Sequence, residues 1–218
     1  MSADVVQSSA PRLRRAIDVS KWQYVRGPID WSAVAASGIE LVYHRLSVGD
    51  ALDQHGGTGL EASRRAGLRA GGYHALTGED IELQVDVFLA AFEPDVVDLP
   101  PRLAPMLDLE RGDSGAGIEA ARRSLAWLEG VEAALGVTPV LYVGPAFARM
   151  HRLGDVPALE RFPVCIAHYG VAQPAAVAPW GDRWTGHQYS GSGLCNGVLG
   201  HVDLSIWRAF PGDPPEGA

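Results

Sequence analysis

The sequence predicts an α/β fold, an irregular TIM-like (β/α) barrel with eight strands and fewer helices in its last third. Eight short runs rich in β-branched, aromatic and apolar residues are spread along the chain. Helical patterns separate the early runs, which indicates parallel strands with helices outside them. The last three runs follow one another through shorter connections rich in proline and glycine. A doubly wound open sheet is the alternative.

The eight expected strands cover much of the chain from residue 15 to residue 207. No G-x-G-x-x-G loop follows the first of them, so nothing supports a dinucleotide site. In order, the runs are RAIDVS (15–20), IELVYHRL (39–46), AGGYHAL (70–76), LAPMLDLE (103–110), TPVLYV (138–143), FPVCIAHY (162–169), RWTGHQYS (183–190) and GHVDLSIW (200–207).

Four helices are expected between the early strands. Asp30 is placed to cap the first helix, which Gly38 ends. Thr58 and Glu61 have capping-box spacing for the second helix, which Gly67 ends. Apolar residues at helical spacing predict the third and fourth helices: Ile81, Val85, Phe88 and Phe92, then Ile118, Ala121, Leu125, Leu128, Val131 and Leu135, with Gly136 as the stop.

Length and composition indicate one domain over residues 15–210, between a flexible arm at 1–14 and a flexible tail at 211–218. With 218 residues, 47% of them hydrophobic, the chain can bury a core without metals or disulfides. Cys165 and Cys195 are expected to be free thiols. The net charge of −8 argues against nucleic acid or an anionic membrane as the main partner.

Four acidic residues fall at or near the carboxyl ends of expected strands. Asp18 lies on the first strand, Asp108 and Glu110 end the fourth, and Asp203 lies on the last. In a β/α barrel the active site is built at this end of the strands. The first and last strands are neighbours in a closed barrel, so Asp18 and Asp203 should lie together.

The Asp108-x-Glu110 spacing places both side chains on one face of a strand, with Cα atoms roughly 6.5–7 Å apart. Two carboxyls this close resist joint ionisation, so the pKa of one should rise. A carboxyl with a raised pKa can act as a general acid near neutral pH. Glycosidic bonds are usually cleaved by such pairs of carboxyls.

Other interpretations of these residues remain open. A single acid at a strand end is usually a turn residue or a helix cap, and clustered carboxylates also bind Mg²⁺ or Ca²⁺. No EF-hand, P-loop or histidine ligand spacing supports a metal, so neither metal nor cofactor is expected. The absence of G-x-S-x-G makes acyl transfer a poor candidate. His44, His168 and His187 are interpreted as core or rim histidines.

Aromatic residues gather near the strand ends, where they could stack on the C–H faces of sugars. Trp31 and Trp207 are interpreted as core residues instead. The full set is Trp22, Trp31, Tyr73, Tyr169, Trp180, Trp184, Tyr189 and Trp207.

From about residue 16 to residue 207 the sequence resembles family 25 of the glycoside hydrolases, the muramidase-type lysozymes of bacteria and phages. The motifs that carry the resemblance are AIDVSKWQ, IDWSAVAASGIELVYHRLSVG, AGLRAGGYHAL, PMLDLE, TPVLYVG, CIAHYG, WTGHQYS and GHVDLSIW. The resemblance implies an irregular β/α barrel that cleaves the β-1,4 bond between N-acetylmuramic acid and N-acetylglucosamine in peptidoglycan.

The resemblance also implies roles for individual residues. Glu110 would be the general acid/base, and Asp108 would orient the substrate's N-acetyl group or stabilise a positively charged intermediate. Asp18 and Asp203 would complete the acidic floor. The substrate-binding residues would be Tyr73, Tyr169, His74 (of GGYH), Arg45 and Gln188.

Several positions depart from the family pattern. Arg45 and Val48 stand where lysine and glutamate are common, Val164 and Cys165 replace an apolar residue and a tryptophan, and His187 replaces a tryptophan. These changes keep two alternatives open. One is a non-catalytic glycan-binding or structural module that keeps the muramidase fold. The other is a different glycosidase, such as a chitinase.

The expected partner is the glycan strand of peptidoglycan, with a phage virion or lysis assembly as a further candidate. The N-terminal MSADVVQSSAPRLRR has no apolar segment of the secretory type. We therefore expect an enzyme that acts on the cell wall after delivery by a phage or by non-standard export.

Overall fold

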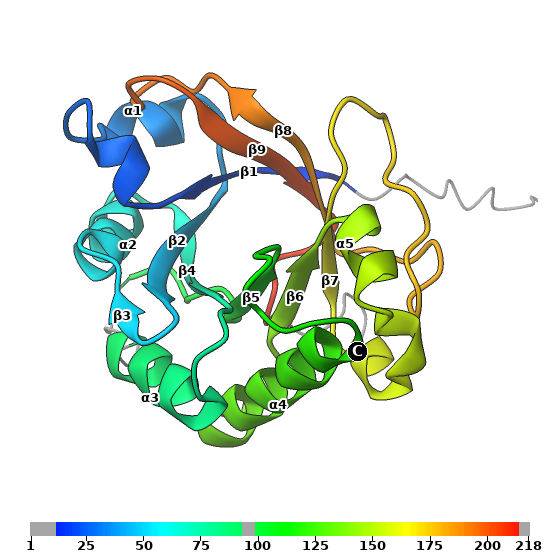
Figure 1. Ribbon diagram of the computed structural model, residues 1–218. Helices are drawn as coiled ribbons and strands as arrows, with labels where there is room; N and C mark the ends of the chain where they lie inside the picture. The colour runs from blue at the N-terminus through cyan, green and yellow to red at the C-terminus, as the bar shows by residue number, and fades with distance from the viewer. Residues whose placement is uncertain (1–11, 93–98, 214–218) are drawn as a thin grey trace, which may run out of the picture.

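The structure, a computed structural model, describes residues 12–92 and 99–213, and eight strands in it close into a barrel (Figure 1). The expected arm and tail lie mostly outside the described residues. β1 pairs with β2 as well as with β9, which closes the ring and excludes the open sheet. The strands are β1 (Arg14–Val19), β2 (Leu41–Val48), β4 (Arg69–Ala75), β5 (Met106–Leu109), β6 (Val140–Val143), β7 (Val164–Ala167), β8 (Gly186–Gly193) and β9 (Val202–Trp207).

The barrel is mixed, because β9 is antiparallel to both of its neighbours, β1 and β8. The strand–helix alternation predicted parallel strands flanked by helices, and among the eight barrel strands β9 departs from that prediction. Only residues 194–201 connect β8 to β9, and a parallel crossover needs a dozen or more residues. A two-residue strand, β3 (Ala51–Leu52), adds a short antiparallel pairing at the end of β2.

Helices lie outside the strands (Figure 1), as the strand–helix alternation predicted. They are α1 (Trp31–Ala36), α2 (Gly56–Arg65), α3 (Ile81–Ala91), α4 (Ile118–Leu135) and α5 (Pro145–Met150), with 3₁₀ turns η1 (Lys21–Tyr24), η2 (Leu153–Asp155) and η3 (Pro157–Arg161). Between η3 and residue 213 the structure has no further helix, which confirms the helix-poor last third. None of the helices in the described part of the chain is long and apolar enough to cross a membrane.

Most helix ends follow the expected chemistry. Asp30 accepts the Ala33 amide at 3.0 Å at the start of α1, and Gly136 ends α4 with the left-handed φ of 67° that favours glycine. The expected capping box of α2 was wrong, since the helix begins at Gly56, before Thr58. Asp53 accepts the His55 amide at 3.1 Å and shapes the turn that starts this helix earlier.

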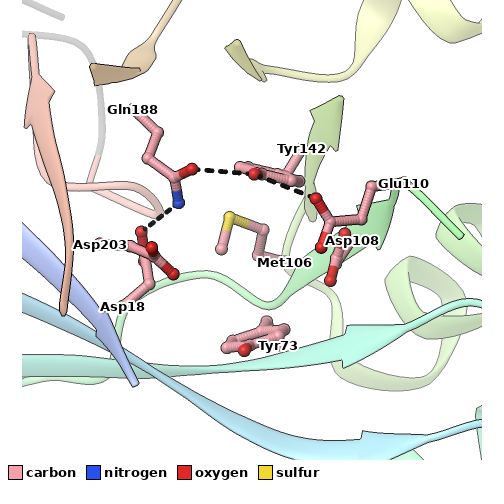
Figure 2. Close-up of a pocket in the computed structure, with 8 residues that line it drawn as sticks. All are labelled: Asp18, Tyr73, Met106, Asp108, Glu110, Tyr142, Gln188 and Asp203. Carbon is pink, nitrogen blue, oxygen red and sulfur yellow. Dashed lines mark hydrogen bonds between the residues drawn. The ribbon is translucent and has the colours of Figure 1, made fainter. Parts of the chain in front are cut away.

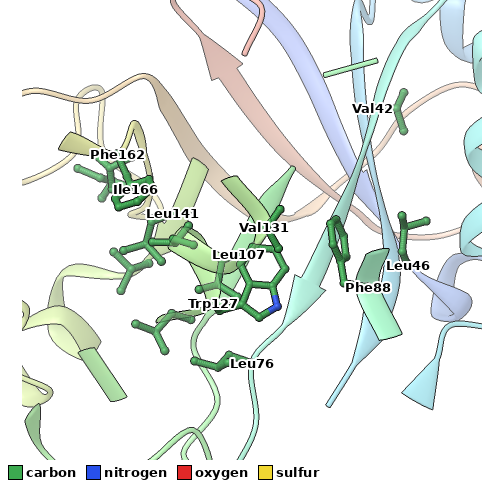
Figure 3. Close-up of a cluster of buried hydrophobic side chains, with 14 of the residues drawn as sticks. Val42, Leu46, Leu76, Phe88, Leu107, Trp127, Val131, Leu141, Phe162 and Ile166 are labelled. Atoms are coloured by element: carbon green, nitrogen blue, oxygen red, sulfur yellow. The ribbon is translucent and has the colours of Figure 1, made fainter. Parts of the chain in front are cut away.

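The main hydrophobic core lies between the barrel and its helices (Figure 3). Trp127 of α4 is fully buried there and contacts the rings of His74 and Phe88, with centroids 5.3 and 5.0 Å away. Branched side chains of the strands' outer faces, among them Val42, Leu107 and Leu141, complete this layer. The helices are therefore fixed against the barrel by apolar packing.

A second apolar cluster fills the barrel interior below its mouth, the end where the parallel strands finish. Tyr43 and Trp207 pack there with ring centroids 5.5 Å apart. A Cβ at Gly186 would lie 2.9 Å from both the Trp207 ring and Cys165 Sγ, so only glycine fits. Trp31 and Trp207 are buried and both cysteines are free, as expected. With the lower interior filled, open space remains at the mouth.

Candidate active site

The four acidic residues named from the sequence line one pocket at the mouth of the barrel (Figure 2). The space between them is small, about 40 Å³. Four other side chains complete its wall and floor. The whole lining is Asp18, Tyr73, Met106, Asp108, Glu110, Tyr142, Gln188 and Asp203.

Asp18 and Asp203 meet because β1 and β9 are neighbours, and their Cα atoms are paired in the sheet. The expected position of Asp203 at a strand's carboxyl end was wrong, since it is the second residue of β9. Because β9 runs antiparallel, its first residues lie at the same rim as the last residues of β1. The reversal of one strand thus preserves the acidic pair.

Asp108 and Glu110 enter the pocket from β5. Asp108 lies within the strand and its residue is 8% exposed, whereas Glu110 follows the strand and is exposed at the mouth. The two carboxyls therefore occupy different depths of one pocket. The deeper one has less contact with water than the outer one.

Gln188 of β8 joins the two sides of the pocket (Figure 2). Its Nε2 donates to Asp18 Oδ2 at 3.0 Å, and its Oε1 accepts from the Tyr142 hydroxyl at 2.9 Å and the Tyr169 hydroxyl at 2.8 Å. The Tyr142 oxygen also lies 3.4 Å from Glu110 Oε2. These contacts fix the amide orientation and connect Asp18 to Glu110 through two side chains.

Two buried carboxylate oxygens in this pocket have no hydrogen-bond partner among the described residues, Asp18 Oδ1 and Asp108 Oδ1. Buried polar atoms are normally paired, and exceptions are frequent where a ligand supplies the partner. Both oxygens belong to groups that line the pocket. The site therefore offers two unused acceptors to the hydrogen-bond donors of a bound molecule.

Burial raises the pKa of the acids that face each other across β1 and β9. The pKa of Asp18 rises to about 7, chiefly because its charged form is removed from water, and the neighbouring Asp203 and Glu110 add to the effect. The pKa of Asp203 rises to about 6 through burial and the charge of Glu110. The Gln188 hydrogen bond opposes the rise at Asp18.

Asp108 and Glu110 titrate as a pair. Burial raises the pKa of Asp108 well above its usual value, the charge of Glu110 raises it further, and Arg45 opposes the rise. Partial burial of its carboxyl also raises the pKa of Glu110, against the Tyr142 hydrogen bond and the charge of Arg111. Ionisation of Glu110 therefore favours the protonated form of Asp108, so the two titrations are linked.

Three of the five residues expected to bind substrate lie at or beside this pocket. Tyr73 and Gln188 line it, and Tyr169, 53% exposed, reaches Gln188 from the rim. Arg45 is not among the pocket-lining residues. It lies beside Tyr73 on the adjoining strand and pairs with Asp53, with Nη2 and Oδ2 2.9 Å apart.

The structure does not bring His74, the fifth expected substrate-binding residue, to the pocket. Side chains alternate along β4, so Tyr73 faces the barrel mouth and His74 faces the helices. His74 is fully buried, with Nδ1 2.8 Å from Ser47 Oγ and Nε2 3.0 Å from Gln84 Oε1. Its surroundings are those of a core residue that links β2, β4 and α3.

Two pocket residues, Tyr142 and Met106, were missed from the sequence. Tyr142 of β6 is paired in register with Asp108, and Met106 lies two residues before Asp108 on the same strand face. The sequence did contain a signal for both residues. Alignment of the expected strands by their carboxyl ends places Tyr142 beside Asp108, and the alternation of side chains places Met106 on the same face as Asp108. Within the described ranges, no cluster of three or more His, Cys, Asp or Glu residues could hold a metal ion.

Comparisons with known proteins point to one family. The sequence profile of "Glycosyl hydrolases family 25" matches residues 17–198. Lysozyme M1 of Streptomyces globisporus is 27% identical over 202 residues, which span 87% of this chain and 66% of the relative. The protein YegX of Escherichia coli K12, described as uncharacterized, is 29% identical over 199 residues, 88% of this chain and 68% of its own length.

Solved structures show the same architecture. The bacterial lysozyme from Streptomyces coelicolor superimposes with a TM-score of 0.79 at 26% identity, over 90% of this chain and 92% of the lysozyme. A family 25 glycosyl hydrolase from Bacillus anthracis gives a TM-score of 0.74 at 20% identity, over 90% and 89% of the two chains. The second likeness concerns the fold alone.

Proposed function

The chain belongs to family 25 of the glycosyl hydrolases, and from this membership we propose that it is a muramidase, which cleaves the β-1,4 bond between N-acetylmuramic acid and N-acetylglucosamine. The family implies hydrolysis of peptidoglycan. One observation carries the specific proposal: Asp108 and Glu110 share a pocket with Asp18 and Asp203. Cleavage of a glycosidic bond needs a proton donor and negative charge near the developing sugar cation.

Glu110 is the proton donor in this proposal. It lies at the outer edge of the pocket, where the oxygen of a glycosidic bond can reach it, and burial of its carboxyl raises its pKa. A carboxyl that keeps its proton nearer neutral pH can donate it to the leaving oxygen. The resulting carboxylate lies 3.4 Å from the Tyr142 oxygen, whose hydroxyl can turn its single proton from Gln188 to Glu110, because Tyr169 still donates to the Gln188 amide oxygen.

Asp108 is the residue that orients the substrate. The pocket's free space of about 40 Å³ has room for a water molecule or a small substituent and is too small for a sugar ring. The glycan would lie at the mouth and direct its N-acetyl group downward. The amide N–H of that group would donate to the unpaired Asp108 Oδ1, so that the acetamido oxygen assists at the anomeric carbon without a protein nucleophile.

Asp18 and Asp203 provide the opposite wall of the pocket. Their carboxylates stabilise positive charge that forms on the sugar ring or its acetamido group, because water has little access there. Gln188 holds Asp18 in place, and its own amide oxygen is fixed by Tyr142 and Tyr169. The exposed ring of Tyr169 gives a sugar an aromatic surface at the rim.

Release of reducing ends from insoluble peptidoglycan, with chitin assayed in parallel, tests the proposal. We expect the wild-type protein to act on peptidoglycan, and Glu110→Gln to lose at least about a hundredfold in rate, since it removes the general acid. Glu160→Gln is the matched control, because Glu160 is an exposed surface residue paired with Arg183. Melting temperatures show whether each variant is folded.

Three results would contradict the proposal. Equal activity of wild type and Glu110→Gln would exclude Glu110 as the acid. Activity on chitin and none on peptidoglycan would indicate a different glycosidase. Binding of peptidoglycan without any release of reducing ends would indicate the non-catalytic module.

A further inference from the structure

Arg45 and Asp53 form a buried ion pair beside the acidic pocket. Arg45 Nε and Nη2 each lie 2.9 Å from Asp53 Oδ2. The side chains are 14% and 1% exposed, so water screens this pair little. Two nitrogens on one edge of the guanidinium thus converge on a single oxygen, which fixes the position of that edge.

Asp53 is itself held by two other segments of the barrel rim. The Lys21 amide of η1 donates to its Oδ2 at 3.2 Å, and the His55 amide before α2 donates to its Oδ1 at 3.1 Å. The carboxylate therefore joins the loop after β1, the end of β2 and the start of α2. With backbone donors on both oxygens, Asp53 cannot turn away from Arg45 without losing these contacts.

The register of the sheet places Arg45 on the pocket side of β2. Arg45 is paired with Tyr73, which lines the pocket, and paired residues of neighbouring strands share a face. The charge of Arg45 lowers the pKa of both Tyr73 and Asp108, against the burial that raises them. The guanidinium thus acts on the deep side of the pocket, where Asp108 lies.

The other charged and titratable groups around Asp108 do not replace Arg45. Arg111, after β5, forms an exposed bidentate pair with Asp113, so its charge is largely matched and screened. The remaining groups repel a negative charge on Asp108 or are neutral near pH 7. They are Glu110 after β5, Asp18 on β1, Asp203 on β9, Tyr73 on β4 and Tyr142 on β6.

We propose that Asp53 is a positioning residue, which holds Arg45 so that one fixed positive charge faces Asp108 and biases the proton of the Asp108–Glu110 pair toward Glu110. The catalytic consequence rests on the proposed function, because only a glycosidase needs the proton on the outer carboxyl. The bias itself is a property of the fold. It can be measured whether or not the protein cleaves peptidoglycan.

The direction in which Asp53→Asn moves the titration of Asp108 distinguishes positioning of Arg45 from a direct effect of the Asp53 charge. If Asp53 acted on Asp108 only through space, removal of its negative charge would move the titration of Asp108 to lower pH. If Asp53 acts by holding Arg45, its loss releases the guanidinium and moves that titration to higher pH. Arg45→Met, which removes the positive charge outright, should shift Asp108 further in the same direction.

The first experiment is a carboxyl ¹³C NMR titration of labelled Asp and Glu in the full chain. We expect Asp108 to titrate at higher pH in Arg45→Met and in Asp53→Asn, and the double variant to equal Arg45→Met alone. Asp155→Asn is the matched control, because Asp155 belongs to an exposed pair with Arg152. A downward shift in Asp53→Asn, or additive effects in the double variant, would overturn the proposal.

The second experiment is the pH profile of kcat/KM on peptidoglycan fragments. We expect Asp53→Asn to lose roughly tenfold at neutral pH, mainly in kcat, with the acidic limb moved to higher pH. Arg45→Lys keeps a charge without the double contact and should fall between wild type and Arg45→Met. An unmoved acidic limb in Arg45→Met, with the fold intact, would contradict the assignment. Failure of wild type to cleave would refute the function and leave the NMR test decisive.

Discussion

Replacement of Asp18 by asparagine should stabilise the protein at alkaline pH while it impairs the site. Asp18 is 6% exposed and its pKa is about 7, against 3.8 for the free side chain. Its folded-state pKa is raised, so the folded protein binds the proton more tightly than the unfolded chain. The contribution of Asp18 to the free energy of unfolding is therefore greatest below about pH 4 and is lost as the pH rises through about 7.

The size of the effect follows from that shift. About three pH units at roughly 1.4 kcal/mol per unit give a cost of about 4 kcal/mol for burial of ionised Asp18 at pH 8. The asparagine of the variant carries no charge, and its side-chain oxygen can still accept from Gln188 Nε2. We therefore expect Asp18→Asn to be more stable than wild type by about 2–4 kcal/mol at pH 8 and by little at pH 4.

Urea unfolding of both proteins between pH 4 and pH 8, followed by the fluorescence of the six tryptophans, measures this difference. The comparison between variants is needed because buried histidines act in the opposite direction. The pKa of His44 is lowered to about 3 and that of His74 to about 4, so these residues stabilise the fold less as pH falls below about 6.5. A stability difference between the two proteins that does not change with pH would show that ionisation of Asp18 does not destabilise the fold.

Three further substitutions test separate parts of the structure. Tyr142→Phe removes a hydrogen bond to the ionised form of Glu110, so the basic limb of the kcat/KM profile should move to higher pH; an unchanged limb would contradict this contact. His74→Ala should cost about 2–4 kcal/mol in urea unfolding, because it leaves the buried Ser47 hydroxyl without its partner and a cavity beside the Trp127 ring, and should leave KM unchanged if the residue is structural. Trp127→Ala should cost about 3–5 kcal/mol by the same assay, and a loss below 1 kcal/mol would contradict the tight packing.

The barrel and the acidic residues could be predicted from the sequence because both depend on local patterns. Strand–helix alternation indicates the parallel part of the barrel, and closure brings Asp18 next to Asp203. To predict the direction of β9, the length of the connection before it, residues 194–201, must also be considered. That length was readable, and it decides the strand's direction and therefore which end of it carries Asp203.

The errors at single residues have a different cause. Whether His74 faces the mouth or the helices depends on the strand register, and a shift of one residue reverses the answer. The family motif GGYH identifies His74 but does not show to which face of the strand its side chain points. Tyr73, the preceding residue, is the one that faces the pocket. The pairing of Arg45 with Asp53 depends on the hairpin of β2 and β3, after which Asp53 follows directly, and no local pattern identifies this hairpin.

Mass spectrometry of digested peptidoglycan after borohydride reduction shows which bond the protein cleaves and whether Glu110 is needed. We expect wild type to produce new reduced muramic acid ends and Glu110→Gln, with an unchanged melting temperature, to produce them at least about a hundredfold more slowly. Reduced glucosamine ends, or equal muramic acid ends from both proteins, would contradict this expectation.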